Sequence, residues 1–310
     1  MTAMAVEAPI VCARTRVVET RVLGDSYVRL VVAGPDLLRW SASVVDPGTV
    51  GDAYVKLLIP PPGGSGVAPD PEDIRGWLGL PESERGWMRT YTVRRADTVE
   101  LDGDLVPALT VDVVVHPGED EGPGSGWARS VRAGDELRIL GPGRGHAPWA
   151  AWSPGQAGRV VCAGDETAVP ALLAIADELA AERSVATATR EVSIVIEVPT
   201  AADAAAVAHG APDFVTVLSR AGEPGTAVVR HLAQVLDLGP DCVDTVMGGR
   251  RPTEREWQPA TAVSAGQPYV FLAGEAGLVR AMRRLAVDAA GIPKSAVAFM
   301  GYWRRGAVES

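Results

Sequence analysis

Apolar and polar residues alternate in short runs through the first half of the chain, a pattern that predicts half-buried β-strands. Val17–Leu23 and Tyr27–Ala33 flank the turn-forming pair Gly24-Asp25 and predict a hairpin. Further strands are predicted over Ala53–Ile59, Met88–Arg95, Leu109–His116 and Glu136–Leu140. About six short strands separated by turn signals are typical of a small β-barrel. Pro61–Gly86 is rich in glycine, proline and acidic residues, and it is predicted to be a loop.

After Gly141-Pro142-Gly143 the pattern changes to short apolar runs that alternate with amphipathic helical stretches. Strands are predicted over Arg159–Ala163, Val192–Val198, Phe214–Leu218, Tyr269–Ala273 and Ala296–Met300, and helices over Thr167–Arg183, Thr226–Leu236 and Leu278–Ala290. This alternation indicates a parallel sheet with crossover helices. We therefore expect two domains, a β-barrel over residues 1–150 and an α/β domain over residues 151–310. The polar segment Val243–Gly266 is interpreted either as a disordered segment or surface flap, or as a substrate lid.

Composition excludes several classes of protein. The 310 residues are 47% hydrophobic and 22% charged, which is enough apolar material for two cores. A net charge of −10 argues against a nucleic-acid or membrane-surface binder. The three cysteines and four histidines have no metal-ligand spacing, so no metal site is predicted. The N-terminal residues do not have the pattern of a signal peptide and no transmembrane span is predicted, so we expect a cytoplasmic protein.

Two segments of the first half have the residue types that bind phosphate. Arg89-Thr90-Tyr91-Thr92 lies in a predicted strand, where Arg89 and Tyr91 share one face and Thr90 and Thr92 the other. The planar guanidinium of Arg89 suits a phosphate, although an ordinary amphipathic strand would also produce this tetrapeptide. Residues 122–128 predict a short helix with Ser125 as its N-cap. Backbone N–H groups at such a helix start can receive pyrophosphate oxygens.

Two segments of the second half have the form strand, turn and helix. Gly164-Asp165-Glu166-Thr167 follows the first predicted strand of the α/β domain and leads into a helix that Thr167 is predicted to start. This layout presents a helix N-terminus to a nucleotide, although the residues are not the Gly-x-Gly-x-x-Gly fingerprint. Ala273-Gly274-Glu275 repeats the form later in the chain.

The C-terminal stretch Leu278–Arg305 is basic, with a local net charge of +5. Its basic residues are Arg280, Arg283, Arg284, Lys294, Arg304 and Arg305, against the single acid Asp288. A solvated helix face explains Arg280 and Arg283. The run Tyr302-Trp303-Arg304-Arg305 instead places two aromatic rings beside two cations, a combination that suits a flat, anionic partner.

In this order, the motifs resemble those of the siderophore-interacting protein family, the FAD-dependent ferric-siderophore reductases of the ferredoxin-reductase-like superfamily. The resemblance extends from Ala13 to Gly306. It implies an N-terminal flavin-binding β-barrel, a parallel-sheet nicotinamide-nucleotide domain, and a flavin in the cleft between them. It also implies that NADH or NADPH reduces FAD, that FAD reduces a ferric siderophore, and that iron leaves as Fe(II). Ferredoxin is an alternative electron donor.

The resemblance assigns roles to individual residues. Arg89 would hold the pyrophosphate, Tyr91 would stack on the flavin ring, and Thr92 would bond near its reactive nitrogen. The other cofactor-binding residues are Thr90, His116, Gly124, Ser125 and Trp127 on the flavin side, and Gly164, Asp165, Glu166, Thr167, Gly274 and Glu275 on the nicotinamide side. The substrate-binding residues are Lys294, Tyr302, Trp303, Arg304 and Arg305. Thr92 and Trp303 are the expected catalytic residues, Trp303 as an aromatic cover of the flavin ring.

One segment departs from the family pattern. Family members have a loop close to Pro-Ala-Ser-Arg-Trp-Ala, whereas this chain has Gly124 and Gly126 in place of the alanine and the arginine. The change removes one possible phosphate contact. Together with the long segment Val243–Gly266, it leaves two alternatives open. One is a flavin reductase or flavin-dependent biosynthetic enzyme on the same fold, and the other is a non-catalytic protein that binds flavin or siderophore.

Overall fold

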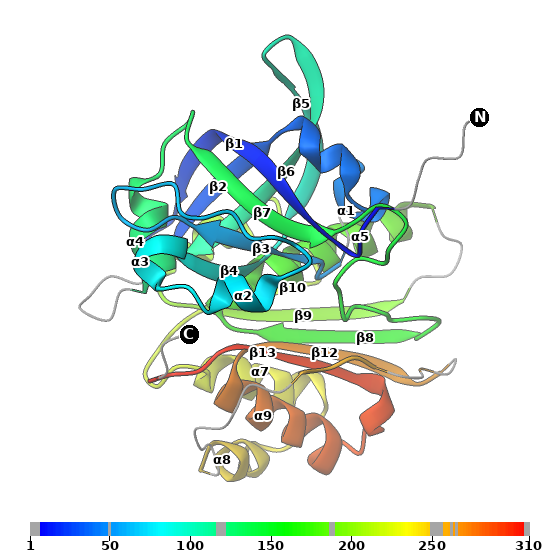
Figure 1. Cartoon of the computed structure of the whole chain (residues 1–310). Helices are drawn as coiled ribbons and strands as arrows, with labels where there is room; N and C mark the ends of the chain where they lie inside the picture. Colours follow the sequence, from blue (N-terminus) through cyan, green and yellow to red (C-terminus); the bar gives the residue numbers. More distant parts are fainter. Residues whose placement is uncertain are drawn as a thin grey trace. The chain divides into compact units, whose positions relative to one another are not determined.

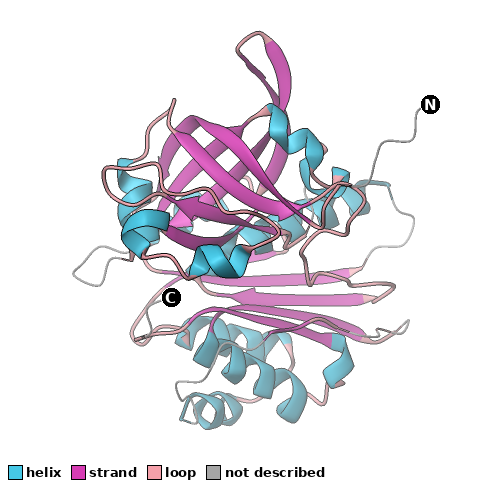
Figure 2. Cartoon of the chain, in the orientation of Figure 1, coloured by secondary structure: helices cyan, strands magenta, loops and turns pink. Residues whose placement is uncertain are grey.

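The computed structural model describes residues 7–48, 51–115, 122–185, 190–248, 257–260, 263 and 266–306. The chain divides into two compact units, Met1–Ala150 (unit 1) and Ala151–Ser310 (unit 2) (Figure 1). Unit 1 is built on strands and unit 2 on alternating strands and helices, as the hydrophobic pattern predicts (Figure 2).

Unit 1 contains a seven-stranded antiparallel sheet with the strand order β4-β3-β7-β1-β2-β6-β5. The strands are β1 (Ile10–Leu23), β2 (Tyr27–Ala33), β3 (Tyr54–Ile59), β4 (Trp87–Thr92), β5 (Arg95–Leu101), β6 (Asp104–Val114) and β7 (Glu136–Pro142). Beyond β4, the N–H of Val93 donates to the carbonyl of Ala53 and the N–H of Arg94 to that of Thr110 on β6. The two edges of the sheet therefore meet at this corner, and the sheet closes into a barrel.

The barrel encloses an apolar core. Along β1, every second residue from Val11 to Val17 is buried, which is the two-residue period of a half-buried strand. Trp40 is the largest fully buried side chain of the chain's core and lies between two short helices of unit 1. The helical elements of unit 1 are η1 (Pro35–Arg39), α1 (Ala42–Val45), α2 (Ile74–Leu78), α3 (Glu82–Arg85) and α4 (Pro123–Ser130).

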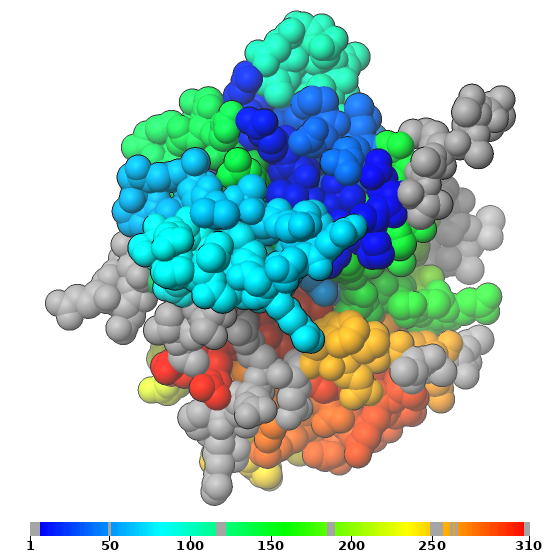
Figure 3. All heavy atoms as spheres, in the orientation of Figure 1, coloured from blue at the N-terminus to red at the C-terminus, as the bar shows by residue number. Residues whose placement is uncertain are grey.

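Two predictions for unit 1 are wrong in detail. The single strand predicted over Met88–Arg95 is two strands, because the chain leaves β3 at Val93 and joins β6 at Arg94. The predicted loop Pro61–Gly86 contains α2 and α3. It is held by Trp77, which is 4% exposed, packs with Leu58 and donates its indole N–H to a loop carbonyl. In the space-filling view this segment, in cyan, covers one face of unit 1 (Figure 3).

Unit 2 contains a six-stranded sheet with the order β10-β9-β8-β12-β13-β11. The strands are β8 (Arg159–Gly164), β9 (Glu191–Val198), β10 (Val215–Ser219), β11 (Trp257–Gln258), β12 (Pro268–Glu275) and β13 (Val297–Trp303). All pair in parallel except β11, which pairs antiparallel to β13. The strand order reverses between β8 and β12, and ligands of open α/β sheets bind at the carboxyl ends of strands at such a switch point.

Helices cover the sheet of unit 2. They are η2 (Glu166–Ala168) leading into α5 (Val169–Val185), α6 (Ala201–Ala208), α7 (Thr226–Val235), α8 (Pro240–Gly248), α9 (Ala276–Arg284), η3 (Leu285–Ala289) and η4 (Lys294–Ala296). Thr167 does not start a helix by itself, since Asp165 caps η2 and α5 follows from Val169. Helix α8 occupies the beginning of Val243–Gly266, and much of the remainder of that segment lies outside the described residues. No helix among the described residues combines the length and apolarity that crossing a membrane requires.

Candidate functional site

The RTYT motif lies on β4 at the edge of the barrel. Arg89 is 8% exposed and Thr92 is also buried, whereas Tyr91 is half-buried and packs against the barrel core. Thr90 is exposed and accepts a hydrogen bond from the Nζ of Lys56 on the neighbouring strand. The structure therefore separates Thr90 from the face that carries Arg89 and Tyr91.

Helix α4 begins next to Tyr91. A Cβ built on Gly124 would lie 2.5 Å from the hydroxyl oxygen of Tyr91, so a side chain at this position would collide with the tyrosine. The glycine that departs from the family's alanine thus lets the start of α4 approach Tyr91 closely. Ser125 is not the N-cap: Gly122 holds that position, Pro123 is the first helical residue, and Ser125 is buried inside the first turn.

Two other residues predicted for the flavin side have different outcomes. Trp127 lies on α4 and packs against the barrel core. His116 lies outside the described residues, so its predicted role stays a prediction.

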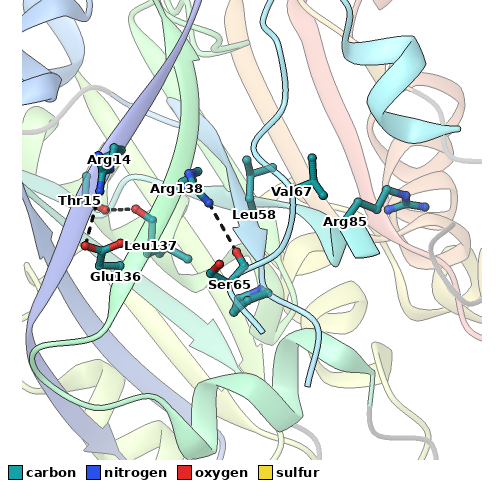
Figure 4. A pocket seen from close by; sticks show the side chains of 10 residues that line it. Arg14, Thr15, Leu58, Ser65, Val67, Arg85, Glu136, Leu137 and Arg138 are labelled. Atoms are coloured by element: carbon teal, nitrogen blue, oxygen red, sulfur yellow. Dashed lines mark hydrogen bonds and ion pairs between the residues drawn. The ribbon is translucent and has the colours of Figure 1, made fainter. Parts of the chain in front are cut away.

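A pocket of unit 1 lies elsewhere on the barrel, beside β1, β7 and the segment that follows β3 (Figure 4). Its lining includes Arg14, Arg85 and Arg138. Arg14 pairs with Glu136 at 3.7 Å, and Arg138 donates to the backbone carbonyl of Ser65 at 3.5 Å. None of the described residues that were predicted to bind FAD lines this pocket.

In unit 2 the GDET motif lies at the switch point, directly after β8. The carboxylate of Asp165 is 3% exposed. Its Oδ1 accepts from the N–H and the hydroxyl of Thr167 at 2.9 and 2.6 Å. Its Oδ2 accepts from the N–H of Glu275 at 2.6 Å and from the indole N–H of Trp303 at 3.3 Å. Asp165 therefore joins the carboxyl ends of β8, β12 and β13.

Glycines make this close approach possible. A Cβ on Gly274, whose φ is +135°, would lie 2.6 Å from the carboxyl carbon of Asp165. A Cβ on Gly164 would lie 2.5 Å from the carbonyl oxygen of Ala273. Both predicted glycines are thus required by the packing of strand ends, whatever the edge of the sheet binds.

Buried carboxylates cap three helices that start at this edge. Asp165 caps η2, and Glu275 accepts from the N–H of Leu278 at 3.0 Å at the start of α9. Glu197, fully buried near the end of β9, accepts from the first turn of α7. A carboxylate at a helix N-terminus is stabilised by the unsatisfied N–H groups and by the helix dipole.

Glu166 completes a buried acidic group with Asp165. Arg220 donates to Glu166 at 2.5 Å and to Glu197 at 3.2 Å, and so bridges the two. Burial, followed by the charge of Asp165, raises the pKa of Glu166 to about 7, against the opposing effect of Arg220. Burial also raises the pKa of Asp165, although hydrogen bonds from Thr167, Glu275 and Trp303 act to lower it.

Glu166 is expected to make the free energy of unfolding fall as the pH rises from about 4.5 to about 7. Its folded pKa lies above the 4.5 of an ordinary glutamate, so the folded state keeps the proton that the unfolded state has lost. The contribution is fully present below pH 4.5 and is lost through pH 7, with a slope of at most about 1.4 kcal/mol per pH unit. Urea unfolding of Glu166→Gln across this range should show a shallower decline. Parallel profiles for the two proteins would contradict the assignment.

The C-terminal residues separate into two groups. Tyr302 and Trp303 end β13 at the switch-point edge, followed by half-buried Arg304 and exposed Arg305. Lys294 lies at the opposite end of β13, roughly 20 Å away at about 3.3 Å per residue, so the structure does not bring it to the aromatic pair.

One basic residue of α9 packs against the core. Arg283 stacks on Phe299 at 4.9 Å within the helix-covered core. This is consistent with a packing role for that part of the basic stretch.

Sequence reasoning missed Glu197 and Arg220. Glu197 is an acid inside the otherwise apolar end of a strand, and a charged residue in such a run signals a buried partner. Arg220 follows β10 directly, but nothing in its local sequence indicates that it meets Glu166. Among the described residues there is no group of histidines, cysteines or acids arranged to hold a metal ion.

Comparison with protein families decides the relationship. A family model described as Siderophore-interacting protein matches residues 157–306, and one described as Siderophore-interacting FAD-binding domain matches residues 16–146. The chain belongs to the siderophore-interacting protein family. The resemblance predicted from the motifs is thereby confirmed, as is the fold of a flavin-domain barrel followed by an α/β unit.

This siderophore-interacting protein is similar to several known proteins. It is 26% identical to a siderophore utilization protein from T. fusca, with a TM-score of 0.64 over 99% of this chain and 98% of the other. It is 28% identical over 253 residues to an uncharacterized protein of Mycobacterium tuberculosis, covering 79% of this chain and 74% of the relative. A shorter match, 41% identical over 96 residues and 29% of each chain, is to the ferric vibriobactin reductase ViuB of Vibrio cholerae.

The residues of unit 1 fit the FAD that the domain family is named for. The close approach of Gly124 to the Tyr91 hydroxyl brings the first turn of α4 to the strand that carries Arg89. In that turn Ser125 and Gly126 donate their N–H groups to the carbonyl of Gly122, which leaves the N–H of Gly124 as the donor suited to a phosphate. A buried arginine, an aromatic ring and a helix start next to each other are a suitable set for a phosphate-bearing aromatic cofactor.

Proposed function

We propose that this protein is an FAD-dependent oxidoreductase that passes electrons from NADH or NADPH to a ferric siderophore and releases iron as Fe(II). The observation that carries the proposal is the close approach of α4 to Tyr91, on the strand that also carries buried Arg89, in a unit that matches an FAD-binding family. The similarity to a ferric vibriobactin reductase over part of the chain supports the choice of substrate class.

The residues of unit 1 would hold the cofactor in distinct ways. Arg89 would pair with the pyrophosphate, Tyr91 would stack on the flavin ring, and the hydroxyl of Thr92 would form a hydrogen bond at the ring's reactive edge. The N–H of Gly124 in the first turn of α4 would add a backbone donor to the phosphate oxygens. Bound FAD would accept two electrons together from the donor and pass them on one at a time.

The residues of unit 2 would bind the electron donor and the ferric chelate. Tyr302 and Trp303 offer aromatic surface, and Arg304 and Arg305 offer positive charge to an anionic iron complex. Hard oxygen ligands hold Fe(III) more tightly than Fe(II), so a reduced chelate releases its iron. This reaction needs orientation and electrostatics from the protein more than proton transfer.

Anaerobic absorbance spectroscopy tests the proposal. Purified protein should bleach its flavin bands on addition of NADH or NADPH and recover them on addition of a ferric chelate, with Fe(II) trapped by a colorimetric ligand. Bleaching without recovery by any ferric chelate would favour a flavin reductase or biosynthetic enzyme. If neither nucleotide reduces the flavin but reduced ferredoxin does, ferredoxin is the electron donor. A flavin that no donor reduces would indicate a binding protein.

The double replacement of Arg304 and Arg305 by glutamine is expected to slow flavin reoxidation by an anionic ferric chelate about tenfold at low salt. The rate with a neutral chelate should change little, because the loss is electrostatic. High ionic strength should shrink the difference. The measurement is anaerobic stopped-flow reoxidation at two salt concentrations.

The matched control is Arg280→Gln/Arg284→Gln, which removes the same charge from α9 in the same basic stretch. It should leave the rate with the anionic chelate nearly unchanged. Equal slowing by the two double variants, or equal slowing with both chelates, would place the substrate at another surface.

A further inference from the structure

The carboxylate of Asp165 is engaged by groups of the protein itself. Both carboxylate oxygens are used within unit 2, where each accepts two hydrogen bonds: from the N–H and hydroxyl of Thr167 on one side, and from the N–H of Glu275 and the indole N–H of Trp303 on the other. A helix N-terminus at a switch point ordinarily offers its N–H groups to a phosphate. Here the side chain of Asp165 occupies that position at η2.

A β-bulge directs Trp303 toward Asp165. Gly274 on β12 is opposite Gly301 on β13, but the next residue, Glu275, is opposite Trp303. Tyr302 is therefore an extra residue on β13. Bulges of this kind redirect the side chains that follow them.

Glu275 adds a second link to the same segment. One carboxylate oxygen caps α9 through the N–H of Leu278, and the other accepts from the backbone N–H of Arg305 at 3.4 Å. The acids of the two strand-turn-helix motifs thus both contact the chain around Trp303. Neither carboxylate is turned to solvent, since both are nearly fully buried.

We propose that Asp165 is a positioning residue for Trp303, and that the GDET motif acts through the C-terminal aromatic segment rather than as a ligand of nucleotide phosphate. The structural part of this inference stands by itself. The effect of this contact on turnover rests on the proposed function, in which Trp303 offers aromatic surface to the flavin and the chelate.

The proposal requires an oxygen that accepts from the indole N–H of Trp303. Four donors surround the two oxygens, two on each oxygen. An amide can keep its oxygen on Trp303 and turn its NH₂ group toward the hydroxyl of Thr167, so the informative variant is Asp165→Ala, which removes both acceptors. Thr167→Val removes one donor from the same carboxylate while leaving Trp303 its acceptor, and so serves as the matched control.

Indole N–H signals test the contact without any substrate. Protein labelled with ¹⁵N-tryptophan has eight indoles, and Trp303→Phe identifies the signal of Trp303 by its loss. In the wild type, solvent exchange of the Trp303 N–H should be at least about tenfold slower than that of exposed Trp257. Asp165→Ala should shift the Trp303 signal and speed its exchange about tenfold, and Thr167→Val should not.

Exchange of the Trp303 N–H as fast as that of Trp257 in the wild type would overturn the proposal, even if Asp165→Ala does not fold. An unmoved Trp303 signal in folded Asp165→Ala would overturn it as well.

Turnover supplies the second test, by a double-mutant cycle on flavin reoxidation by a ferric chelate. Asp165→Ala should slow reoxidation about tenfold in the wild-type background and have little further effect in the Trp303→Phe background. Equal slowing in both backgrounds would show that Asp165 acts by another route. If no chelate reoxidises the wild-type flavin, the proposed function fails, and the indole measurement still decides the contact.

Discussion

Replacement of Arg89 by alanine is expected to weaken FAD binding by about 1.5–3 kcal/mol, or roughly ten- to a hundredfold. Arg89 is 8% exposed and lies on the strand that also carries Tyr91, whose hydroxyl is next to the first turn of α4. A charge-assisted contact to phosphate has this magnitude where water is largely excluded. The measurement is titration of the apoprotein with FAD, followed by flavin fluorescence.

Comparison with FMN makes the experiment specific. The wild type should prefer FAD, because Arg89 and α4 together suit a pyrophosphate, and Arg89→Ala should reduce that preference. Arg95→Ala is the control, since Arg95 is an exposed arginine of the same motif region that pairs with Asp97. Equal affinity of the wild type for FAD and FMN, or equal weakening by the two variants, would remove the assignment of Arg89.

Replacement of Glu197 by alanine is expected to lower the free energy of unfolding by about 3–5 kcal/mol. Its carboxylate accepts from the N–H groups of Gly225, Ala227 and Val228 at 2.7–3.1 Å and from Arg220 at 3.2 Å. The variant leaves the first turn of α7 without its acceptor in a fully buried position and removes one of the two carboxylates that Arg220 binds. Urea unfolding of the purified protein measures the loss.

Glu191 on the same strand provides the comparison. It pairs with Arg159 at 3.1 Å, but its side chain is 64% exposed, so Glu191→Ala should cost no more than about 1 kcal/mol. Similar losses for the two variants would mean that Glu197 is not the acceptor that stabilises α7.

Local patterns predict the elements of this chain better than its contacts. The two-residue period of the barrel strands and the apolar runs of β8 and β12 identify strands because burial acts on each strand separately. The break between β4 and β5 could not be predicted, because Val93 and Arg94 change hydrogen-bonding partners without changing the alternation of apolar and polar residues. Helix α6, composed largely of alanine, was not predicted. Its start is marked by the N-cap Thr200, whose hydroxyl accepts from the N–H of Asp203.

The candidate site was predictable as motifs, but its internal chemistry was not. Gly164 and Gly274 can be found from strand-turn-helix form, and parallel strands bring their carboxyl ends to one edge. That Asp165 meets Trp303, 138 positions later, depends on the order of strands in the sheet and on one extra residue in β13. The N-cap assigned to Ser125 was wrong because Pro123 already satisfies the first helical position.

The extra residue in β13 makes the spacing of the C-terminal aromatic residues as important as their identity. Side chains alternate along a strand, so removal of Tyr302 would not simply delete one ring. A regular ladder would then carry the tryptophan one step closer to Gly301 and redirect its indole. Length variation between Gly301 and Trp303 is therefore a sharper criterion than residue similarity for deciding which homologous sequences share this arrangement.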